Sequence, residues 1–178
     1  MAEDLRHDDP VDGGLNAARA ALIEECEREQ ENCLYTSASF YIWLRTLKIA
    51  RASLWALGVI GSIVAASSIL GGMQSYPIIV ASLALAGVLM PGLVKALRLD
   101  AAIEDYAAAA ASFKNLQGEF RRAARVWSHK PFAEFEVDAR KTIKTMNEAR
   151  KPSLTPPEWC FRQAQKKVKR GDYDKDDR

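Results

Sequence analysis

The apolar and charged positions divide the chain around one uncharged stretch, residues 52–94. This stretch contains no Asp, Glu, Lys, Arg or His. One helical crossing of a bilayer needs about 20 apolar residues, so the stretch is long enough for two crossings. Paired glycines and a proline interrupt the apolar pattern at 71–77. The sequence therefore predicts a transmembrane helical hairpin with spans at about 52–70 and 77–94.

The charges beside this stretch favour a membrane over the core of a soluble protein. A buried hairpin can also be apolar on all sides, but the rest of this chain is mostly charged, alanine-rich or polar and is poorly suited to wrap it. Residues 32–99 contain no acidic side chain. Basic side chains close to a span are typical anchors at the membrane surface. The predicted anchors are Arg45, Lys48, Arg51, Lys95 and Arg98.

The same basic residues predict the orientation of the hairpin. Both flanks of the hairpin are basic, whereas the connecting loop carries no charge. Basic flanks stay on the cytoplasmic side of a membrane. We therefore expect a multi-pass protein with both termini in the cytoplasm and the loop outside.

The segments outside the hairpin predict cytoplasmic helices between two tails. Residues 1–14 are acidic and poor in apolar side chains, which predicts disorder, and the acidic segment 171–178 is expected to behave in the same way. No Gly or Pro interrupts 15–51, so a helix there is expected to continue into the first span. Residues 95–170 are expected to form further helices. The predicted fold is an all-α membrane protein whose transmembrane hairpin is continuous with a cytoplasmic antiparallel helical bundle.

Apolar residues recur in both cytoplasmic segments at alternating spacings of four and three, which is the pattern of a helix seam. A membrane hairpin brings its two cytoplasmic extensions together, so we expect the two seams to pack on one another. A Thr155–Glu158 capping box predicts the start of the last helix. The predicted seam residues are Cys33, Phe40, Leu44, Ile103, Tyr106, Phe113, Phe120 and Trp127.

Small residues in the first span predict a close contact between helices. Gly58, Ser62 and Ala66 fall at four-residue intervals, with Gly61 and Ala65 beside them. In lipid, small residues at this spacing let helix backbones approach closely. Such a contact can join the two spans of one chain, join two subunits, or do both. The hydroxyls of Ser62 and Ser82 can line a polar path in an oligomer or bond to their own helix backbone.

Two further features leave alternatives open. Pro91 and Gly92 are expected to loosen the end of the second span, either as a gate hinge or as a joint with the next helix, and we favour the joint. Cys26, Cys33 and Cys160 lie in predicted cytoplasmic segments, where structural disulfides are disfavoured. We expect buried core residues there, with a regulatory thiol pair as the alternative.

Several kinds of chemistry have no support in the sequence. There is no glycine-rich phosphate loop, no zinc-binding His-Glu motif, no nucleophile elbow and no paired Cys/His spacing. The predicted spans lack ionisable residues, which argues against an ion-coupled carrier. We therefore predict a protein that is not an enzyme and that has no cofactor, no metal and no nucleic-acid partner.

Three segments carry a resemblance to a known family, and their order along the chain carries more of it than any single residue. These segments are Glu29–Ala38 followed by Trp43, Tyr106 followed by Arg121–Arg125, and Pro156–Tyr173. In this order of elements the chain resembles the SLATT family of bacterial two-transmembrane effector domains, which are associated with SMODS nucleotidyltransferases and SLOG proteins.

The resemblance implies an effector of the bacterial inner membrane. Such an effector assembles with further copies of itself and forms a pore or disrupts the membrane when an antiphage system produces a nucleotide signal, so that the infected cell dies. The implied partners are the lipid bilayer, further copies of the chain, and a nucleotide second messenger or sensor protein. The alternative is a non-conducting membrane tether that docks a cytoplasmic partner through its helical bundle, and the nearly apolar hairpin fits this alternative well.

Overall fold

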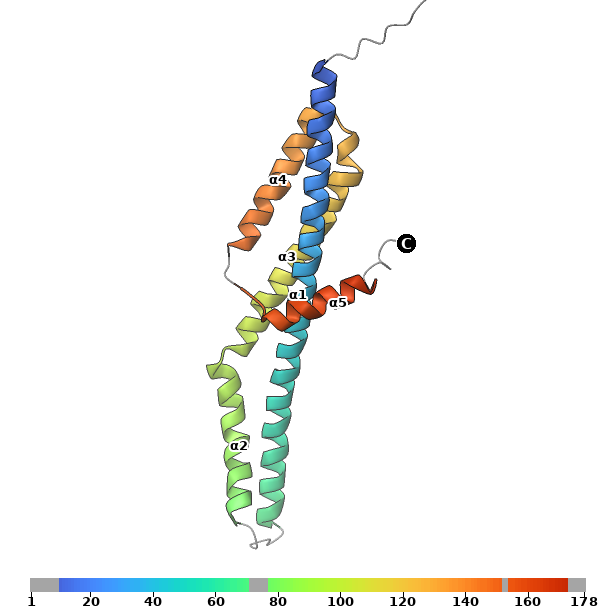
Figure 1. Ribbon diagram of the computed structural model, residues 1–178. Helices are drawn as coiled ribbons and strands as arrows, with labels where there is room; N and C mark the ends of the chain where they lie inside the picture. The colour runs from blue at the N-terminus through green and yellow to red at the C-terminus, as the bar shows by residue number, and fades with distance from the viewer. Residues whose placement is uncertain (1–9, 71–76, 152–153, 173–178) are drawn as a thin grey trace, which may run out of the picture. The chain divides into compact units, whose positions relative to one another are not determined.

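A computed structural model of the chain describes residues 10–70, 77–151 and 154–172, which form helices and contain no strand (Figure 1). This confirms the predicted all-helical class. The elements are α1 (Pro10–Leu70), α2 (Pro77–Ala96), α3 (Leu99–Arg125), the short 3-10 helix η1 (Trp127–His129), α4 (Phe132–Arg150) and α5 (Glu158–Lys169).

The chain divides into two compact units. The first, here called the bundle unit, contains Met1–Ser39 and Ala109–Arg178; the second, the paired-helix unit, contains Phe40–Ala108. The helix α1 is 61 residues long and contributes to both units. The bundle unit otherwise holds most of α3 together with η1, α4 and α5, and the paired-helix unit holds α2 and the start of α3.

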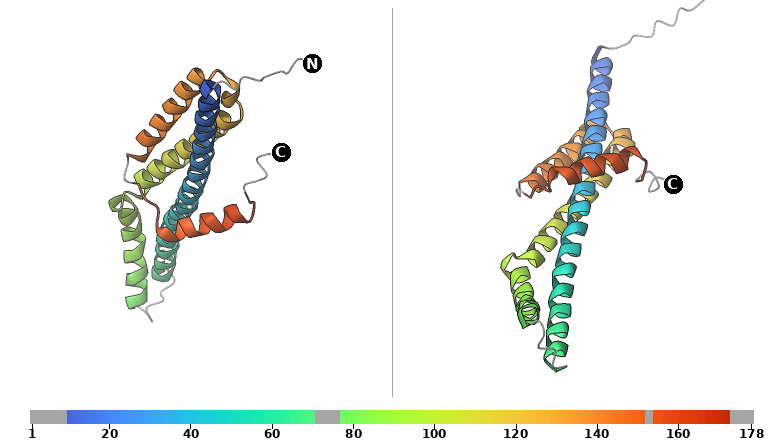
Figure 2. Two further views of the ribbon diagram at one scale, coloured as in Figure 1. Left: turned by 45° about the horizontal axis from the view of Figure 1, so that its top comes forward. Right: turned by 60° about the horizontal axis from the view of Figure 1, so that its bottom comes forward.

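The first part of α1 lies beside α3 and α4 in the bundle unit (Figure 2). The core of this unit consists of apolar and small side chains. Polar contacts fasten the first part of α1 to the chain that follows α3. Arg19 donates hydrogen bonds to the carbonyl oxygens of Ser128 and Lys130. Further along α1, Glu29 pairs with Arg150 of α4 at 3.0 Å. The buried residues of this unit include Cys26, Cys33, Ala38, Ala110, Phe113, Leu116, Phe120, Ala123, Phe135, Ala139, Met146, Cys160 and Ala164.

The paired-helix unit places the last part of α1 antiparallel to α2 (Figures 1 and 2). Toward the start of α3, the side chains of Leu44, Leu47 and Ile103 form a buried apolar cluster. The ring of Tyr106 lies 5.9 Å from that of Phe40 and 6.4 Å from that of Trp43, measured between ring centroids.

Helix boundaries differ from the sequence prediction at both ends of the chain. The helix α1 begins at Pro10, so residues 10–14 are helical where a disordered tail was expected. The last helix α5 begins at Glu158 with Pro157 in the N-cap position, two residues after the predicted cap Thr155. The predicted interruption at 71–76 and most of the two predicted tails, residues 1–9 and 173–178, lie outside the described residues.

The joint between α2 and α3 was predicted at Pro91 and Gly92, but it lies several residues further along the chain. The helix continues through Pro91 and Gly92 to Ala96. Its backbone then turns at Arg98, which has a φ of 50° and is the first residue before α3. Proline removes one backbone donor but leaves the other hydrogen bonds of the helix in place. The left-handed backbone at Arg98 is therefore what separates the two helices.

This left-handed residue leads to a stability prediction. Glycine occupies positive φ without the Cβ clash that other residues suffer, and the difference is about 1 kcal/mol. We expect Arg98→Gly to have a higher free energy of unfolding than Arg98→Ala by about that amount, as measured by detergent-to-SDS unfolding. Both variants lose the same charge, so equal stabilities would contradict the strained backbone.

Candidate functional site

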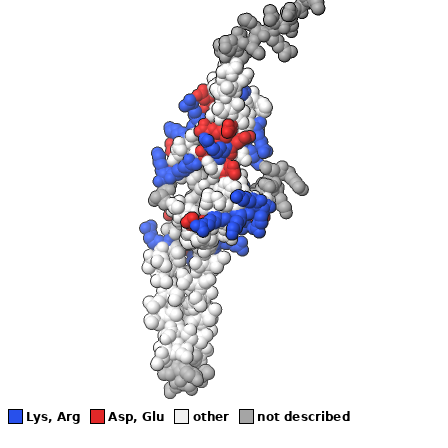
Figure 3. All heavy atoms as spheres, in the orientation of Figure 1, with Lys and Arg blue, Asp and Glu red and all other residues white. Residues whose placement is uncertain are grey.

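The last part of α1 and most of α2 expose large apolar side chains. Ile78 is 81% exposed and Val88 is 76% exposed. Figure 3 shows that the visible face of this helix pair carries no charged side chain. Exposed apolar surface of this kind marks a site of contact with a membrane or a protein. Its members are Trp55, Leu57, Val59, Ile60, Ile63, Val64, Ile78, Ile79, Leu85, Val88, Leu89 and Leu93.

Two helices are long and apolar enough to cross a membrane. One lies within Gly13–Ser67 and the other is Ile78–Ala96. A core helix of a soluble protein can reach the same length and composition, but its apolar side chains are covered by the rest of the protein. Few residues of these two segments are buried in the structure. Their environment in the folded chain is therefore unlike that of a soluble core.

The five predicted anchors form a basic rim at one end of this helix pair. They are all exposed, and they belong to the end of the pair that is continuous with α3. Among the described residues of this unit, Arg51 is the one member of the set that pairs with an acidic residue, Asp100, at 2.6 Å. Exposed ion pairs of this type contribute at most about 1 kcal/mol. The basic rim consists of Arg45, Lys48, Arg51, Lys95 and Arg98.

Glycines bring the backbones of α1 and α2 together. Gly58 and Gly61 are buried and face α2. A Cβ at Gly61 would lie 2.8 Å from the carbonyl oxygen of Leu83, and a Cβ at Gly58 would lie 3.4 Å from the Cβ of Met90. Only glycine allows the approach at position 61, because the group that it faces is backbone rather than a movable side chain.

The packing face of α1 differs from the predicted one. Ala65 is 3% exposed and belongs to the contact, whereas the predicted Ala66 is exposed. The buried positions Gly58, Gly61 and Ala65 follow the three-and-four spacing of a helix seam rather than a uniform spacing of four. Ser62 is exposed overall but still touches α2, since a Cβ at Gly87 would overlap its hydroxyl.

Gly87 is a contact residue that the sequence reasoning missed. Its carbonyl oxygen would normally accept a hydrogen bond from residue 91, and Pro91 has no N–H to donate. A Cβ at Gly87 would overlap the hydroxyl of Ser62 and lie 3.2 Å from the carbonyl oxygen of Gly58, so the missing side chain is what allows the contact. A glycine four positions before a proline inside an apolar span is the signal that could have identified this position.

Three serine hydroxyls of the helix pair are bonded within their own helices. Ser62 donates to the carbonyl oxygen of Gly58 at 2.9 Å, and Ser67 donates to that of Val64 at 3.0 Å. Ser82 donates to the carbonyl oxygen of Ile78 at 2.8 Å. These bonds are the backbone alternative of the prediction, and the polar path that was considered for an oligomer stays a prediction. Since the hydroxyl hydrogens are used, such a path would consist of serine oxygens from several copies of the chain, which accept hydrogen bonds from water.

The predicted seam residues are buried or half-buried in their respective units. Phe40, Leu44 and Ile103 are buried, and Tyr106 packs beside them. In the bundle unit Cys33, Phe113 and Phe120 are buried, while Trp127 is half-buried. The ammonium of Lys130 lies 5.6 Å from the centre of the Trp127 ring.

The three cysteines are buried free thiols. Burial raises the pKa of Cys26, with a smaller contribution from Glu25, and it raises the pKa of Cys33, each from 9.0 to about 11. Burial also raises the pKa of Cys160. A nucleophilic or redox-active cysteine needs a lowered pKa and access to solvent. These thiols have the properties of core residues.

Their raised pKa leads to a prediction about reactivity and pH. At pH 8 the thiolate fraction of Cys26 and Cys33 is about a hundredfold below that of a free thiol, so we expect slow reaction with an aromatic disulfide reagent and fast reaction in denaturant. The unfolded chain releases these protons from pH 9 upward, whereas the folded chain retains them. Stability from these thiols is therefore complete below pH 9 and is lost as the pH rises to about 11. Equal reactivity in the native and denatured protein would contradict this assignment.

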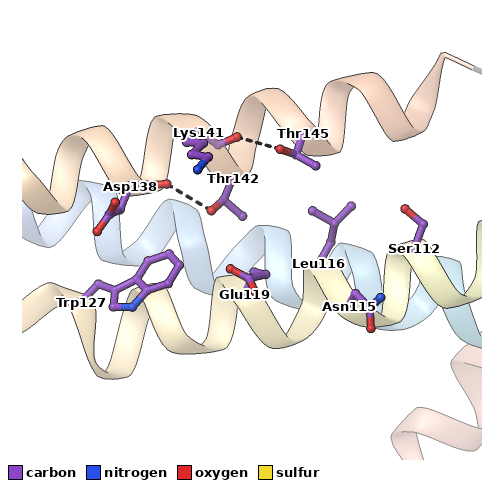
Figure 4. A pocket seen from close by; sticks show the side chains of 9 residues that line it. All are labelled: Ser112, Asn115, Leu116, Glu119, Trp127, Asp138, Lys141, Thr142 and Thr145. Carbon is purple, nitrogen blue, oxygen red and sulfur yellow. Dashed lines mark hydrogen bonds between the residues drawn. The ribbon is translucent and has the colours of Figure 1, made fainter.

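A cavity of about 570 Å³ lies between α3 and α4 in the bundle unit (Figure 4). Trp127 lines one part of it, together with the carboxylates of Glu119 and Asp138 and the ammonium of Lys141. Asp138 is paired with Lys130 at 2.7 Å. A phosphate needs a surplus of positive charge, and this lining contains more carboxylates than ammonium groups. The cavity therefore does not provide a phosphate site for a nucleotide.

Neither a metal-binding group nor a similar known protein assigns a function to the chain. Within the described ranges, no three His, Cys, Asp or Glu side chains are grouped in a way that could hold a metal ion. No family model, no curated protein and no solved structure matches the chain. The geometry of the helix pair and its basic rim therefore carries the functional argument.

Proposed function

We propose that the chain is an integral protein of the bacterial inner membrane whose last part of α1 and α2 cross the bilayer as a hairpin. The basic rim lies at the cytoplasmic surface, and both termini lie in the cytoplasm. The observation that carries this proposal is the exposed, uncharged apolar surface of the helix pair, which ends at the basic rim. A bilayer supplies the apolar surroundings that the rest of the folded chain does not provide.

The magnitude of the hydrophobic effect supports a membrane rather than water around these helices. Moving a large apolar side chain from water to apolar surroundings is favourable by about 1.5–3 kcal/mol. The exposed set on α1 and α2 together amounts to a favourable transfer on the order of 10–20 kcal/mol. The basic rim opposes deeper insertion of the helix pair, because charged side chains are costly inside the hydrocarbon. These two terms together define how far the helix pair enters the bilayer.

We further propose that several copies assemble and permeabilise the membrane in an antiphage response, as the resemblance to the SLATT family implies. One helix pair has no polar path of its own, so conduction requires an oligomer. The signal reaches the bundle unit either as a nucleotide second messenger, at a place other than the cavity between α3 and α4, or through a sensor protein that docks there. Activation of this assembly would stop growth of the infected cell.

The test is membrane potential in a bacterial host that expresses the intact protein, followed with a potential-sensitive dye. At high expression, mass action favours the oligomer, and we expect depolarisation together with arrested growth. The same protein purified and reconstituted into dye-loaded liposomes should release the dye. A chain that is fully inserted and oligomeric, yet leaves both the potential and the liposomes intact, would overturn the effector proposal.

A non-conducting membrane tether is the second candidate, and the serine hydrogen bonds favour it. Ser62, Ser67 and Ser82 donate to their own backbones, so these three hydroxyl groups offer no free donor to water or ions. A tether would hold the bundle unit at the membrane for a cytoplasmic partner without dissipating the potential. Retained membrane association without dye release would favour this candidate.

A further inference from the structure

A second, smaller cavity lies on α1 within the paired-helix unit. Its volume is about 430 Å³. Tyr41, Arg45, Lys48 and Ala52 follow one another at intervals of four, three and four, so they occupy one face of the helix. Tyr41, Arg45 and Lys48 therefore bring three polar groups to the same face. The complete lining is Tyr41, Leu44, Arg45, Lys48, Ile49 and Ala52.

The position of the cavity along α1 matches the headgroup layer of a bilayer. Ala52 begins the uncharged stretch. With a rise of 1.5 Å per residue, Lys48 lies about 6 Å and Arg45 about 10 Å before it along the helix. The headgroup layer on each side of a bilayer is about 5–8 Å thick. Lys48 therefore lies at the level of lipid phosphates and Arg45 lies at the outer edge of the headgroup layer, within reach of them through its long side chain, while Ile49 and Ala52 lie where acyl chains begin; this placement rests on the function proposed above.

The charges around the cavity suit an anion. Residues 32–99 contain no acidic side chain. Asp100, the next acidic residue along the chain, is engaged by Arg51 at 2.6 Å. Arg45 and Lys48 are both exposed, and no described carboxylate of this unit pairs with them. A guanidinium can hold two phosphate oxygens at once, and an ammonium adds a point charge.

We propose that this cavity binds the headgroup of one anionic phospholipid. Arg45 and Lys48 hold the phosphate, and the phenol of Tyr41 donates a hydrogen bond to the headgroup. The first part of an acyl chain lies along Ile49 and Ala52. A lipid bound here would also provide apolar cover for exposed surface on α1. The site distinguishes anionic from zwitterionic lipids by charge, since a zwitterionic headgroup brings its own cation.

The other half of the basic rim supplies a matched control. Lys95 and Arg98 carry the same total charge as Arg45 and Lys48, but they do not line this cavity. Replacing either pair by glutamine removes two positive charges beside the apolar helices. Only replacement of the cavity pair removes the proposed phosphate ligands.

The test is native mass spectrometry of the full chain in detergent, with phosphatidylglycerol or phosphatidylcholine added. Each basic contact is worth about a fivefold factor, so R45Q/K48Q should weaken phosphatidylglycerol binding on the order of thirtyfold. We expect K95Q/R98Q to weaken it less than about threefold, Tyr41→Phe to weaken it a few-fold, and phosphatidylcholine to bind poorly to all proteins. Excess inorganic phosphate should not displace the lipid, because it lacks the acyl contacts.

Three results would overturn the lipid site. One is equal loss in the two double variants, which would indicate attraction to the whole rim. Another is displacement of the lipid by inorganic phosphate. The third is a change in the oligomer number of R45Q/K48Q with unchanged lipid binding, which would show that a second copy of the chain occupies the cavity. Each of these leaves membrane insertion intact, whereas a wild-type chain that never enters the membrane fraction would contradict the proposed function itself.

Discussion

Replacing Val88 with lysine is expected to remove much of the chain from the membrane fraction. Val88 lies inside α2 and is 76% exposed, so the proposed hairpin directs it at the lipid. A lysine near the centre of a membrane helix costs about 2.5–3.5 kcal/mol of insertion free energy. This corresponds to a shift on the order of a hundredfold in the insertion equilibrium of α2. The measurement is the share of protein that resists alkaline carbonate extraction.

Val137→Lys is the matched control for this prediction. Val137 lies on α4 and is 66% exposed, but it belongs to the bundle unit. The same substitution there adds a solvated charge to a polar surface, and we expect wild-type extraction behaviour. Equal resistance to extraction in Val88→Lys, Val137→Lys and the wild-type chain would show that the exposed face of α2 does not contact lipid.

Replacing Gly61 with leucine is expected to separate α1 from α2 and to abolish membrane permeabilisation. Even a methyl group at this position would lie 2.8 Å from the backbone oxygen of Leu83. Overpacking of this kind typically costs about 1–3 kcal/mol, and membrane helices rely on close packing for association. We expect the free energy of unfolding to fall by that amount and dye release from liposomes to fall at least tenfold, since the contact is part of the oligomer's building block.

Gly92→Leu provides the corresponding control on the partner helix. A Cβ at Gly92 meets no atom within 4 Å, so a leucine there finds open space. Stability and dye release should stay close to wild type. A Gly61→Leu protein that releases dye as well as Gly92→Leu does would mean that the contact between α1 and α2 is not required for activity.

The distribution of charge and small residues predicted much of this arrangement. The uncharged stretch 52–94 predicted two long apolar helices, and the structure contains two that meet this description. The spacing of apolar residues identified positions that are buried, including Phe40, Leu44 and Ile103. These signals are local and periodic, so they can be read from one chain.

The details that depend on how two helices cross could not be read in this way. Choosing Ala65 over Ala66 requires the direction in which α1 faces α2, and both residues are alanine. Gly87 is a contact because a Cβ there would overlap the hydroxyl of Ser62, and this requires knowing that the two residues face each other. The joint at Arg98 requires a backbone angle that favours glycine or asparagine, and arginine gives no signal for it.

The most direct test of the membrane hairpin is cysteine labelling with a membrane-impermeant maleimide. The native thiols are buried and have a raised pKa, so they give little background. Gln74→Cys, in the predicted external loop, should be labelled in intact spheroplasts, whereas Val137→Cys should be labelled only after lysis. A Val88→Cys protein should resist labelling in both conditions. Labelling of Val137→Cys in intact spheroplasts, or of Gln74→Cys only after lysis, would contradict the hairpin orientation, and rapid labelling of Val88→Cys would contradict its place in the bilayer.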